Sequence, residues 1–371
     1  MRKFAYVTNI PTPYRDFRFR LLSSELKKYN VELVVLYMAK TEPNRDWDAN
    51  ELCKGYCSHF FKNFGVNLGK RFFLHFNPSL LFHLYREKYD FVVVGGISSP
   101  THILAPFFCK QSDLTLSVES NLDSIKNKSL IFSKVKSFII SKYKRFQVTG
   151  QRSADYVKSY YPCELTDKNF LFFRNLINEE DFKSVGSPIN VDKSKINIVC
   201  VARLEEMKGI VEWIRSVKEV DLSNVHIYVV GGGTLYEYIL GIIESYKLPI
   251  TLVGNTSSKQ VSAWLQEADI FLLPSKRDAS PLSCIEAVYM AKPLLISDKV
   301  GNVDDVLKEG ENGYKFDIYS QESVVSSLKK ALDLTSLERK SFGEKSRVIY
   351  VQNFEPKYQI SKYVEKILNV N

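Results

Sequence analysis

The chain has 371 residues, of which 45% are hydrophobic and 25% charged, with a formal net charge of +9. This length exceeds what one ordinary hydrophobic core accommodates, so two domains are expected. The sequence contains no apolar run long enough to span a bilayer, and its six cysteines are too scattered for a disulfide framework or a zinc site, which indicates free thiols in a reducing compartment.

The first half of the chain alternates short apolar runs with helical patterns. The first apolar run follows Met1-Arg2-Lys3 directly, which is typical of the first strand of a fold and not of a signal peptide. Alternating strands and helices predict βαβ units around a mostly parallel sheet. The expected strands are 4–7, 31–37, 91–94, 114–118 and 145–148, and the expected helices include 17–28, 102–110 and 153–161.

The second half repeats this arrangement, so the fold class is α/β with two doubly wound, Rossmann-like domains. We expect an N-terminal domain over 1–187, a C-terminal domain over 188–350, and a final helix over 351–371 that packs back toward the N-terminal domain; the helical pattern itself runs over 337–368. The boundary lies near 183–192, where Gly, Ser, Pro and Asp cluster. Expected strands are 196–201, 225–230, 250–253, 270–273 and 293–296, and expected helices are 209–217, 234–245, 258–267 and 284–290.

The excess positive charge lies in the first half. Residues 1–185 hold 28 Lys and Arg against 18 Asp and Glu, whereas the remainder holds 23 against 24. Segment 126–145 combines bases with apolar residues at helical spacing, which predicts a basic amphipathic helix that binds an anionic membrane surface. The alternative is a core-packed helix with a basic outer face. The sequence has no recognisable nucleic-acid-binding motif, so no nucleic acid is expected as a partner.

Two cations and two carboxylates follow predicted strands of the second half. Arg203 and Lys208 come after the strand 196–201, and Asp278 and Glu286 come after the strand 270–273. Ligands of doubly wound folds bind outside the carboxyl ends of the strands. Fixed cations neutralise the charge that accumulates on a departing nucleotide diphosphate, and a carboxylate can accept hydrogen bonds from two ribose hydroxyls. Taken singly, each residue is also compatible with a surface charge, a helix cap or a salt bridge.

The ordered set resembles the donor-binding domain of retaining glycosyltransferases of family 4. The resemblance implies the GT-B architecture, two Rossmann-like domains facing a central cleft, and transfer of a sugar from a nucleotide-sugar donor without a metal or other cofactor. The similar segments occur in order at 201–209, 229–233, 252–255, 268–275, 278–286, 292–298 and 309–314, and Asn175 resembles the family's interdomain segment.

The resemblance also implies roles in donor binding. Arg203 and Lys208 would hold the diphosphate, Glu286 would bind ribose hydroxyls, and Asp278 would contact sugar hydroxyls, with both acids counted as catalytic. Backbone amides at two further positions would reach the phosphate or sugar, and two residues would border the base. These are Leu282 and Ser283, and Gly254 and Asn255, respectively.

The chain departs from the family at a few of these positions. Most members carry Glu where this chain has Asp278, which keeps the charge but shortens the reach. The family also favours Gly near Ser280 and Ser283, and often at Lys292. The departures leave donor identity and activity open.

The first domain resembles the family less specifically. The segment 8–15 follows the first strand in a Pro-Thr-Pro-Tyr-Arg form similar to transferases of bacterial surface polysaccharides. Amides near Thr12 would face the diphosphate, while Arg15 and Gly96 would lie on the acceptor side. Glu119, where many members carry His or another polar group, would be a third catalytic residue that orients an acceptor hydroxyl or stabilises positive charge. A structural salt bridge is the alternative for Arg15 and for Glu119.

Residues 46–48 have the Asp-Trp-Asp form of the Asp-x-Asp motif of metal-dependent glycosyltransferases. In those enzymes the acids follow a strand and bind a divalent ion through nucleotide phosphates. Here they lie well beyond the nearest predicted strand, in a polar loop, so no metal site is expected. An acceptor contact by Arg45 or Trp47 is the other option.

The sequence therefore predicts a retaining glycosyltransferase that uses a nucleotide-sugar donor and a lipid-linked oligosaccharide or glycan acceptor in bacterial polysaccharide biosynthesis, such as that of O-antigen, capsule or exopolysaccharide. The expected location is the cytoplasm, with peripheral attachment to the inner face of the cytoplasmic membrane as a further option. Two alternatives are a GT-B sugar-nucleotide epimerase or hydrolase, and a degenerate, non-catalytic protein that binds a nucleotide or a partner.

Overall fold

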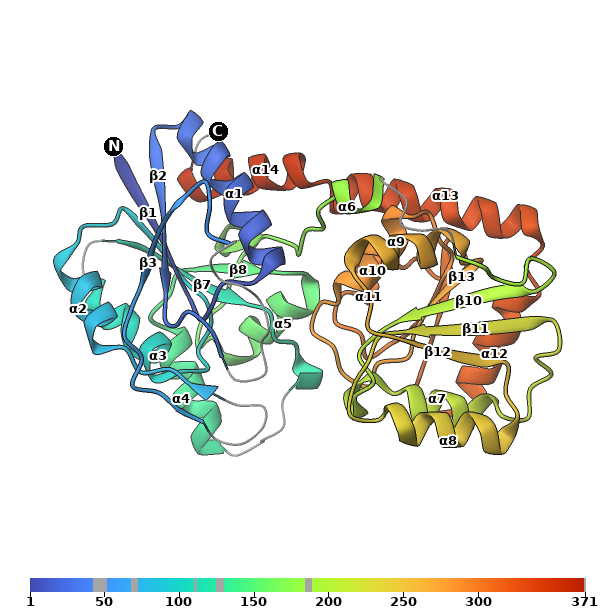
Figure 1. Cartoon of the computed structure of the whole chain (residues 1–371). Coiled ribbons are helices and arrows are strands. Elements are labelled where there is room, and N and C mark those ends of the chain that lie inside the picture. The colour runs from blue at the N-terminus through green and yellow to red at the C-terminus, as the bar shows by residue number, and fades with distance from the viewer. Residues whose placement is uncertain (43–51, 68–72, 110–111, 125–129, 184–188, 370–371) are drawn as a thin grey trace. The chain divides into compact units, whose positions relative to one another are not determined.

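The computed structural model describes residues 1–42, 52–67, 73–109, 112–124, 130–183 and 189–369. The chain forms two compact units, each built on its own parallel sheet with helices on both faces (Figure 1). Unit 1 comprises Met1–Arg174 and Pro356–Asn371, and unit 2 comprises Asn175–Glu355.

The sheet of unit 1 has seven parallel strands in the order β3-β2-β1-β6-β7-β8-β9. The chain adds β2 and β3 on one side of β1 and then crosses to β6 on the other side, so the strand order reverses between β1 and β6. A doubly wound sheet binds ligands at such a reversal. The strands are β1 (Arg2–Thr8), β2 (Val31–Tyr37), β3 (Cys57–Phe60), β6 (Phe91–Val94), β7 (Asp113–Val118), β8 (Arg145–Val148) and β9 (Phe170–Phe172), beside a small antiparallel pair, β4 (Val66–Asn67) and β5 (Phe73–Leu74).

Four helices of unit 1 begin with proline, whose fixed φ suits the first helical position and whose missing N–H is not needed there. They are α1 (Pro13–Lys28), α2 (Pro78–Arg86), α3 (Pro100–Phe108) and α14 (Pro356–Leu368). The remaining helical segments are η1 (Leu122–Ser124), α4 (Leu130–Ile140), α5 (Gln151–Tyr160) and η2 (Asp167–Asn169).

The sheet of unit 2 has six parallel strands in the order β12-β11-β10-β13-β14-β15, and its order reverses between β10 and β13. Its strands are β10 (Ile196–Val201), β11 (Val225–Val230), β12 (Ile250–Gly254), β13 (Ile270–Leu273), β14 (Leu294–Ser297) and β15 (Gly313–Phe316). Its helices are α6 (Glu180–Lys183), η3 (Glu206–Lys208), α7 (Ile210–Val217), α8 (Tyr236–Tyr246), α9 (Ser258–Glu267), α10 (Leu282–Tyr289), α11 (Val303–Val306), α12 (Gln321–Leu332) and α13 (Ser336–Asn353).

The chain passes from unit 1 to unit 2 at an earlier residue than the sequence analysis predicted. Strand β9 pairs with β8, so the chain stays in unit 1 through Phe172, whereas the Asn175 side chain already donates a hydrogen bond to the Ser280 carbonyl in unit 2. The structure thus divides at 174/175, where the sequence analysis placed the boundary at 187/188. Residues 184–188 of the predicted boundary segment lie outside the described residues.

The predicted helix over 337–368 is two helices. Helix α13 ends at Asn353 and α14 begins at Pro356, because a proline cannot continue the hydrogen-bonding of the preceding turns. Helix α14 belongs to unit 1, where the guanidinium of Arg145 donates to the carbonyls of Lys366 and Ile367 at 2.7 and 2.8 Å. The final helix therefore packs on the N-terminal unit, starting at residue 356 and not at 351.

Helix α4 exposes most of its apolar side chains. In the segment 126–145, Ile139 and Tyr143 are buried, whereas Ile131, Val135 and Phe138 are 75%, 49% and 56% exposed. In the described part, 130–145, the C-terminal end of α4 packs on the core, as the alternative interpretation expected, while most apolar side chains of the helix are exposed, which that interpretation did not expect. No helix in the described ranges combines the length and the apolar character that crossing a bilayer requires.

Candidate functional site

Lys208 and Asp278 form an ion pair at the carboxyl edge of the sheet of unit 2. The Lys208 Nζ contacts the Asp278 Oδ2, and the two side chains are only 13% and 17% exposed. Lys208 lies in the loop after β10 and Asp278 in the loop after β13, and these neighbouring strands flank the reversal of strand order. The structure therefore brings together two residues that are seventy positions apart in the sequence.

Close main-chain packing holds the two loops together. Gly209 has a φ of +67°, and a Cβ there would lie 2.1 Å from the carbonyl oxygen of Pro274, so glycine is required. The carbonyl of Met207 accepts hydrogen bonds from the amides of Lys276 and Arg277 at 2.9 and 3.3 Å. The position of Lys208 is thus fixed by backbone contacts on both sides.

Glu286 lies on α10 and is half-buried. Its carboxyl forms no hydrogen bond or ion pair with any residue that the structure describes. Burial, together with the nearby carboxylate of Asp181, raises the pKa of Glu286 to about 7. A half-buried carboxyl without donors can accept hydrogen bonds from a ligand that supplies them.

The thiol of Cys284 shows that Lys208, Asp278 and Glu286 converge. The thiol is fully buried, and burial raises its pKa well above the usual value. The charge of Asp278 raises this pKa further, that of Lys208 lowers it, and that of Glu286 raises it. The charges of all three side chains therefore act on one buried thiol in unit 2.

Arg203 stands apart from this cluster. It follows β10 in the same loop as Lys208, but its side chain is exposed and forms no hydrogen bond or ion pair with a described residue. Three of the four predicted charged residues, Lys208, Asp278 and Glu286, therefore lie near one another. The side chain of the fourth, Arg203, is exposed to solvent.

The start of α10 is braced by two asparagines. Asn175 donates from Nδ2 to the carbonyl of Ser280 at 3.0 Å, and Asn302 donates from Nδ2 to the carbonyl of Pro281 at 3.1 Å. Leu282 and Ser283 are the first two residues of this helix, so their amides have no partner within it and offer donors to a ligand. Sequence analysis missed Asn302, because a single asparagine in a loop carries no distinctive signal.

Gly254 and Asn255 follow β12 and lie beside the glycine-rich loop after β11. The amide of Gly231 donates to the carbonyl of Gly254 at 2.9 Å, and the amide of Gly232 donates to the Asn255 Oδ1 at 2.8 Å. A Cβ on Gly231 would lie 2.2 Å from the carbonyl oxygen of Ala202. These contacts connect the loops after β12, β11 and β10 along the carboxyl edge.

Unit 1 gathers a second set of residues at the carboxyl edge of its own sheet. The guanidinium of Arg15 donates to the Thr8 Oγ1 at 3.1 Å and lies 4.0 Å from the Glu119 carboxylate. Thr12 precedes α1, is 4% exposed, and its Oγ1 has no hydrogen-bond partner among the described residues. Gly96 has a φ of +128°, and no atom lies within 4 Å of a Cβ built on it. The contact between Arg15 and Glu119 is the salt bridge that the alternative interpretation of these two residues expected, at the long distance of 4.0 Å.

His102 is a residue that sequence analysis did not select. It lies on α3, is completely buried, and neither ring nitrogen has a hydrogen-bond partner in the described part of the chain. Burial, together with the charges of His75 and Arg15, lowers its pKa to about 3. Its apolar neighbours, Ile103 and Leu104, gave no signal of a site. Residues 45–48, which include Arg45, Trp47 and the two acids of the Asp-x-Asp form, lie outside the described residues.

Comparisons with known proteins concern the family and the fold of the chain. The family profile described as glycosyl transferases group 1 matches residues 182–349. The putative colanic acid biosynthesis glycosyltransferase WcaL of Escherichia coli (strain K12) is 28% identical over 138 residues, which cover 34% of each chain. A lipopolysaccharide 1,2-N-acetylglucosaminetransferase of Salmonella typhimurium is 21% identical over 58% of this chain and 61% of that protein. The chain thus spans about a third of the length of the first of these relatives.

Solved structures show the same fold over the whole chain. Sucrose-phosphate synthase from Thermosynechococcus elongatus superposes with a TM-score of 0.73 at 14% identity, and Anabaena HepE in complex with UDP superposes with a TM-score of 0.75 at 13% identity; each match covers 100% of both chains. At these identities the similarity establishes the fold alone. The chain has the GT-B fold, and most of its second unit matches the family model of glycosyl transferases group 1.

Proposed function

We propose that this protein is a retaining glycosyltransferase of family 4 that transfers a sugar from a nucleotide-sugar donor to a lipid-linked glycan acceptor in bacterial polysaccharide biosynthesis. The observation that carries the proposal is the convergence of Lys208, Asp278 and Glu286 at the reversal of strand order in unit 2. The names of the relatives, which act in colanic acid and lipopolysaccharide synthesis, support the pathway.

Donor binding would begin with an exchange of partners. The Lys208 ammonium is neutralised by Asp278 in the structure, and a diphosphate would replace Asp278 as its partner. Asp278 would then accept hydrogen bonds from sugar hydroxyls. This exchange keeps each buried charge paired, which avoids the cost of an isolated charge.

Departure of the nucleoside diphosphate would be stabilised by cations of the chain itself. Lys208 is held in place by the backbone of its loop, so it needs little reorganisation as negative charge develops. Arg203, exposed in the same loop, would turn onto the diphosphate and bind it with its planar guanidinium. With these two cations and the amides of Leu282 and Ser283, the proposed reaction uses no metal.

Glu286 would bind the ribose. Its carboxyl lacks donors in the structure, and two vicinal hydroxyls would supply them. Gly254 and Asn255 would border the base, since they lie further along the same edge of the sheet.

The acceptor side is assigned to unit 1. Glu119 is 39% exposed and only loosely paired with Arg15, so its carboxylate is available to orient an acceptor hydroxyl. Thr12 and Gly96 complete this edge, the first with an unpartnered buried hydroxyl and the second with open space beside its Cα.

Attachment to an anionic membrane surface would use α4. Five of its seven apolar side chains are exposed, and lysines flank them, which is the pattern of a helix that lies in the interface of a bilayer. Lys142 lies 4.2 Å from the ring centroid of Phe138, so one cation accompanies an exposed aromatic ring. The most exposed apolar residues of α4 are Leu130, Ile131 and Phe132, at 79%, 75% and 58%. The protein would thus work from the cytoplasmic side of that membrane.

A release assay tests the proposal. A panel of nucleotide-sugars is incubated with the protein, with and without lipid-linked glycan acceptors, and the free nucleoside diphosphate is measured. We expect release that requires both one donor and an acceptor. Release without an acceptor would indicate a hydrolase, conversion of the donor's sugar would indicate an epimerase, and binding without release would indicate a non-catalytic protein. Each of these three results contradicts the proposal.

A further inference from the structure

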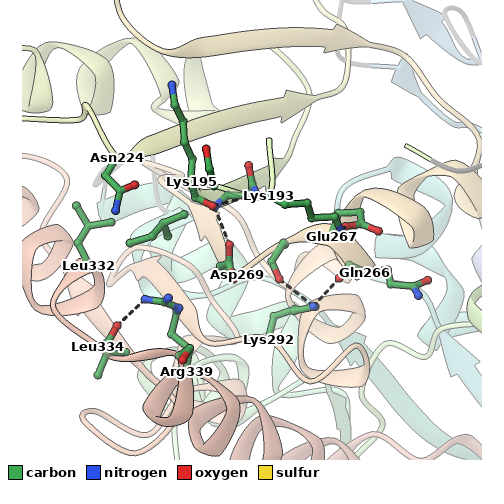
Figure 2. A pocket seen from close by; sticks show the side chains of 15 residues that line it. Lys193, Lys195, Asn224, Gln266, Glu267, Asp269, Lys292, Leu332, Leu334 and Arg339 are labelled. Carbon is green, nitrogen blue, oxygen red and sulfur yellow. Dashed lines mark hydrogen bonds and ion pairs between the residues drawn. The ribbon is translucent and has the colours of Figure 1, made fainter. Parts of the chain in front are cut away.

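A polar cavity of about 660 Å³ lies at the amino edge of the sheet of unit 2 (Figure 2). Its wall includes residues that directly precede strands: Asn224 before β11, Asp269 before β13 and Lys292 shortly before β14. Lys208 and Asp278 lie at the opposite, carboxyl edge. The cavity is therefore separate from the candidate donor site, and its volume is within the range typical of small-molecule sites.

The lining of this cavity is positively charged. Four cations and two carboxylates contribute, which gives a net charge of +2. The cations come from three places in the chain: the segment before β10, the turn before β14, and the first turn of α13. They are Lys193, Lys195, Lys292 and Arg339, and the carboxylates are Glu267 and Asp269.

Three of the four cations have no carboxylate partner among the described residues. Lys193 pairs with Glu267, but Lys195 forms no side-chain hydrogen bond or ion pair. The guanidinium of Arg339 donates only to the carbonyl of Leu334 (Figure 2). Lys195 and Arg339 are half-buried, so their charges are only partly solvated.

Lys292 adds a third cation that lacks a counter-ion. Its ammonium donates to the carbonyls of Gln266 and Ala268 at 2.9 and 2.8 Å (Figure 2). Burial lowers its pKa, the carboxylates of Asp269 and Glu267 raise it, and the charge of Lys193 lowers it. An anion in the cavity would offset the desolvation of this ammonium.

The cavity also contains an unused acceptor. Asn197 lines it and is 3% exposed; its Nδ2 donates to the carbonyls of Asp192 and Lys195, but its Oδ1 has no partner among the described residues. A buried acceptor without a donor is costly. A hydroxyl group on a ligand would satisfy it.

We propose that this cavity binds a small phosphate monoester that carries hydroxyl groups. A phosphate monoester has nearly two negative charges at neutral pH, which matches the net charge of the lining. The guanidinium of Arg339 and the ammonium groups of Lys195 and Lys292 are suited to phosphate oxygens. Asn197 would accept from a ligand hydroxyl. This site is independent of the proposed sugar transfer.

Isothermal titration calorimetry with glycerol 3-phosphate tests the site. We expect saturable binding that is weaker for inorganic phosphate and absent for glycerol. Lys195→Gln, which removes no side-chain contact with a described residue, should weaken binding. Lys195→Gln combined with Arg339→Gln should weaken it by at least about tenfold, because two cations that would bind the phosphate are lost.

Two controls locate the binding. Lys308→Gln, which changes an exposed lysine of unit 2 away from the cavity, should leave the affinity for glycerol 3-phosphate unchanged. Lys208→Ala should also leave it unchanged, even if it abolishes nucleotide binding. Absence of saturable binding, or equal affinities in the wild type and in Lys195→Gln, would overturn the proposal. Equal affinities for glycerol 3-phosphate and inorganic phosphate would overturn the hydroxyl contact.

Discussion

The two units share one plan but differ at the edge where ligands bind. In unit 2 the reversal between β10 and β13 holds a tight Lys208–Asp278 ion pair and a carboxyl, Glu286, without a partner. In unit 1 the corresponding edge holds a 4.0 Å contact between Arg15 and Glu119. Fixed charges suit a ligand that always carries a diphosphate, whereas loosely paired groups suit a ligand recognised by its hydroxyls.

The units also differ in their surface charge. Unit 1 carries 30 Lys and Arg against 16 Asp and Glu, a net charge of +14, whereas unit 2 carries 21 against 26, a net charge of −5. Positive charge that is distributed over a surface attracts a large anionic partner such as a membrane. A partly buried charge in a loop interacts with one bound group. Under the proposed function, the membrane would therefore bind unit 1 and the nucleotide would bind unit 2.

The largest expected effect is that of Lys208→Ala. Transfer should fall by roughly 10² to 10³, because a preorganised group that stabilises the leaving diphosphate is lost. Steady-state kinetics measures this, and circular dichroism with thermal melting checks that the fold survives. Lys308→Ala is the matched control. Turnover close to the wild type in Lys208→Ala would disprove the role given to unit 2.

Charge reversal on unit 1 should abolish membrane binding. Replacing Lys134, Lys136, Lys142 and Lys144 by Glu changes the sign of the surface beside α4, so co-sedimentation with anionic vesicles should be lost, while binding to neutral vesicles stays weak. Donor binding, measured by calorimetry, should not change. If the variant sediments with anionic vesicles as the wild type does, the lipid role of unit 1 fails.

Asp278→Asn should separate sugar recognition from nucleotide binding. The change leaves the Lys208 ammonium without its carboxylate partner, so the affinity for a nucleoside diphosphate should stay equal or increase. The kcat/KM for transfer should decrease by about tenfold or more, since contacts to the sugar are lost. A weaker affinity for the nucleoside diphosphate would contradict the proposed exchange of partners.

The smallest expected effect concerns Glu286 and pH. Its pKa is raised from 4.5 to about 7 in the folded protein, so the folded state holds this proton more tightly than the unfolded state does. This contribution to stability is present below pH 4.5, decreases between pH 4.5 and 7, and is absent above pH 7. Glu286→Gln should therefore be more stable than the wild type above pH 7 and equal to it below pH 4.5, as urea unfolding at several pH values would show. A stability difference that does not vary with pH would contradict this assignment.

Much of the fold followed from local sequence pattern. Strands such as β2, β6, β10 and β11 are mostly apolar runs, and their predicted limits match the structure. The missed strands β3, β9 and β15 are short and lie at sheet edges, where one side lacks a neighbour and the apolar pattern is weaker. The break at Pro356 was also visible in the sequence but was not used.

The sequence predicted the site only to the extent that charged residues follow the ends of predicted strands. Spacing after β10 and β13 selected Lys208, Asp278 and Glu286, because parallel strands end at the same edge of a sheet. Asn302, Asp181 and His102 could not be selected in this way, since their neighbours are distant in sequence and their local context is ordinary.

The sequence by itself determined two α/β units, the strand ends that carry charged residues, and a basic first half, because these depend on composition and short-range periodicity. Only the tertiary structure decided which charges are paired, that Arg203 stays in solvent, that α4 exposes its apolar side, and that a positive cavity forms at the amino edge of unit 2. Those features depend on contacts between residues far apart in the chain, and such contacts leave no pattern in a single sequence.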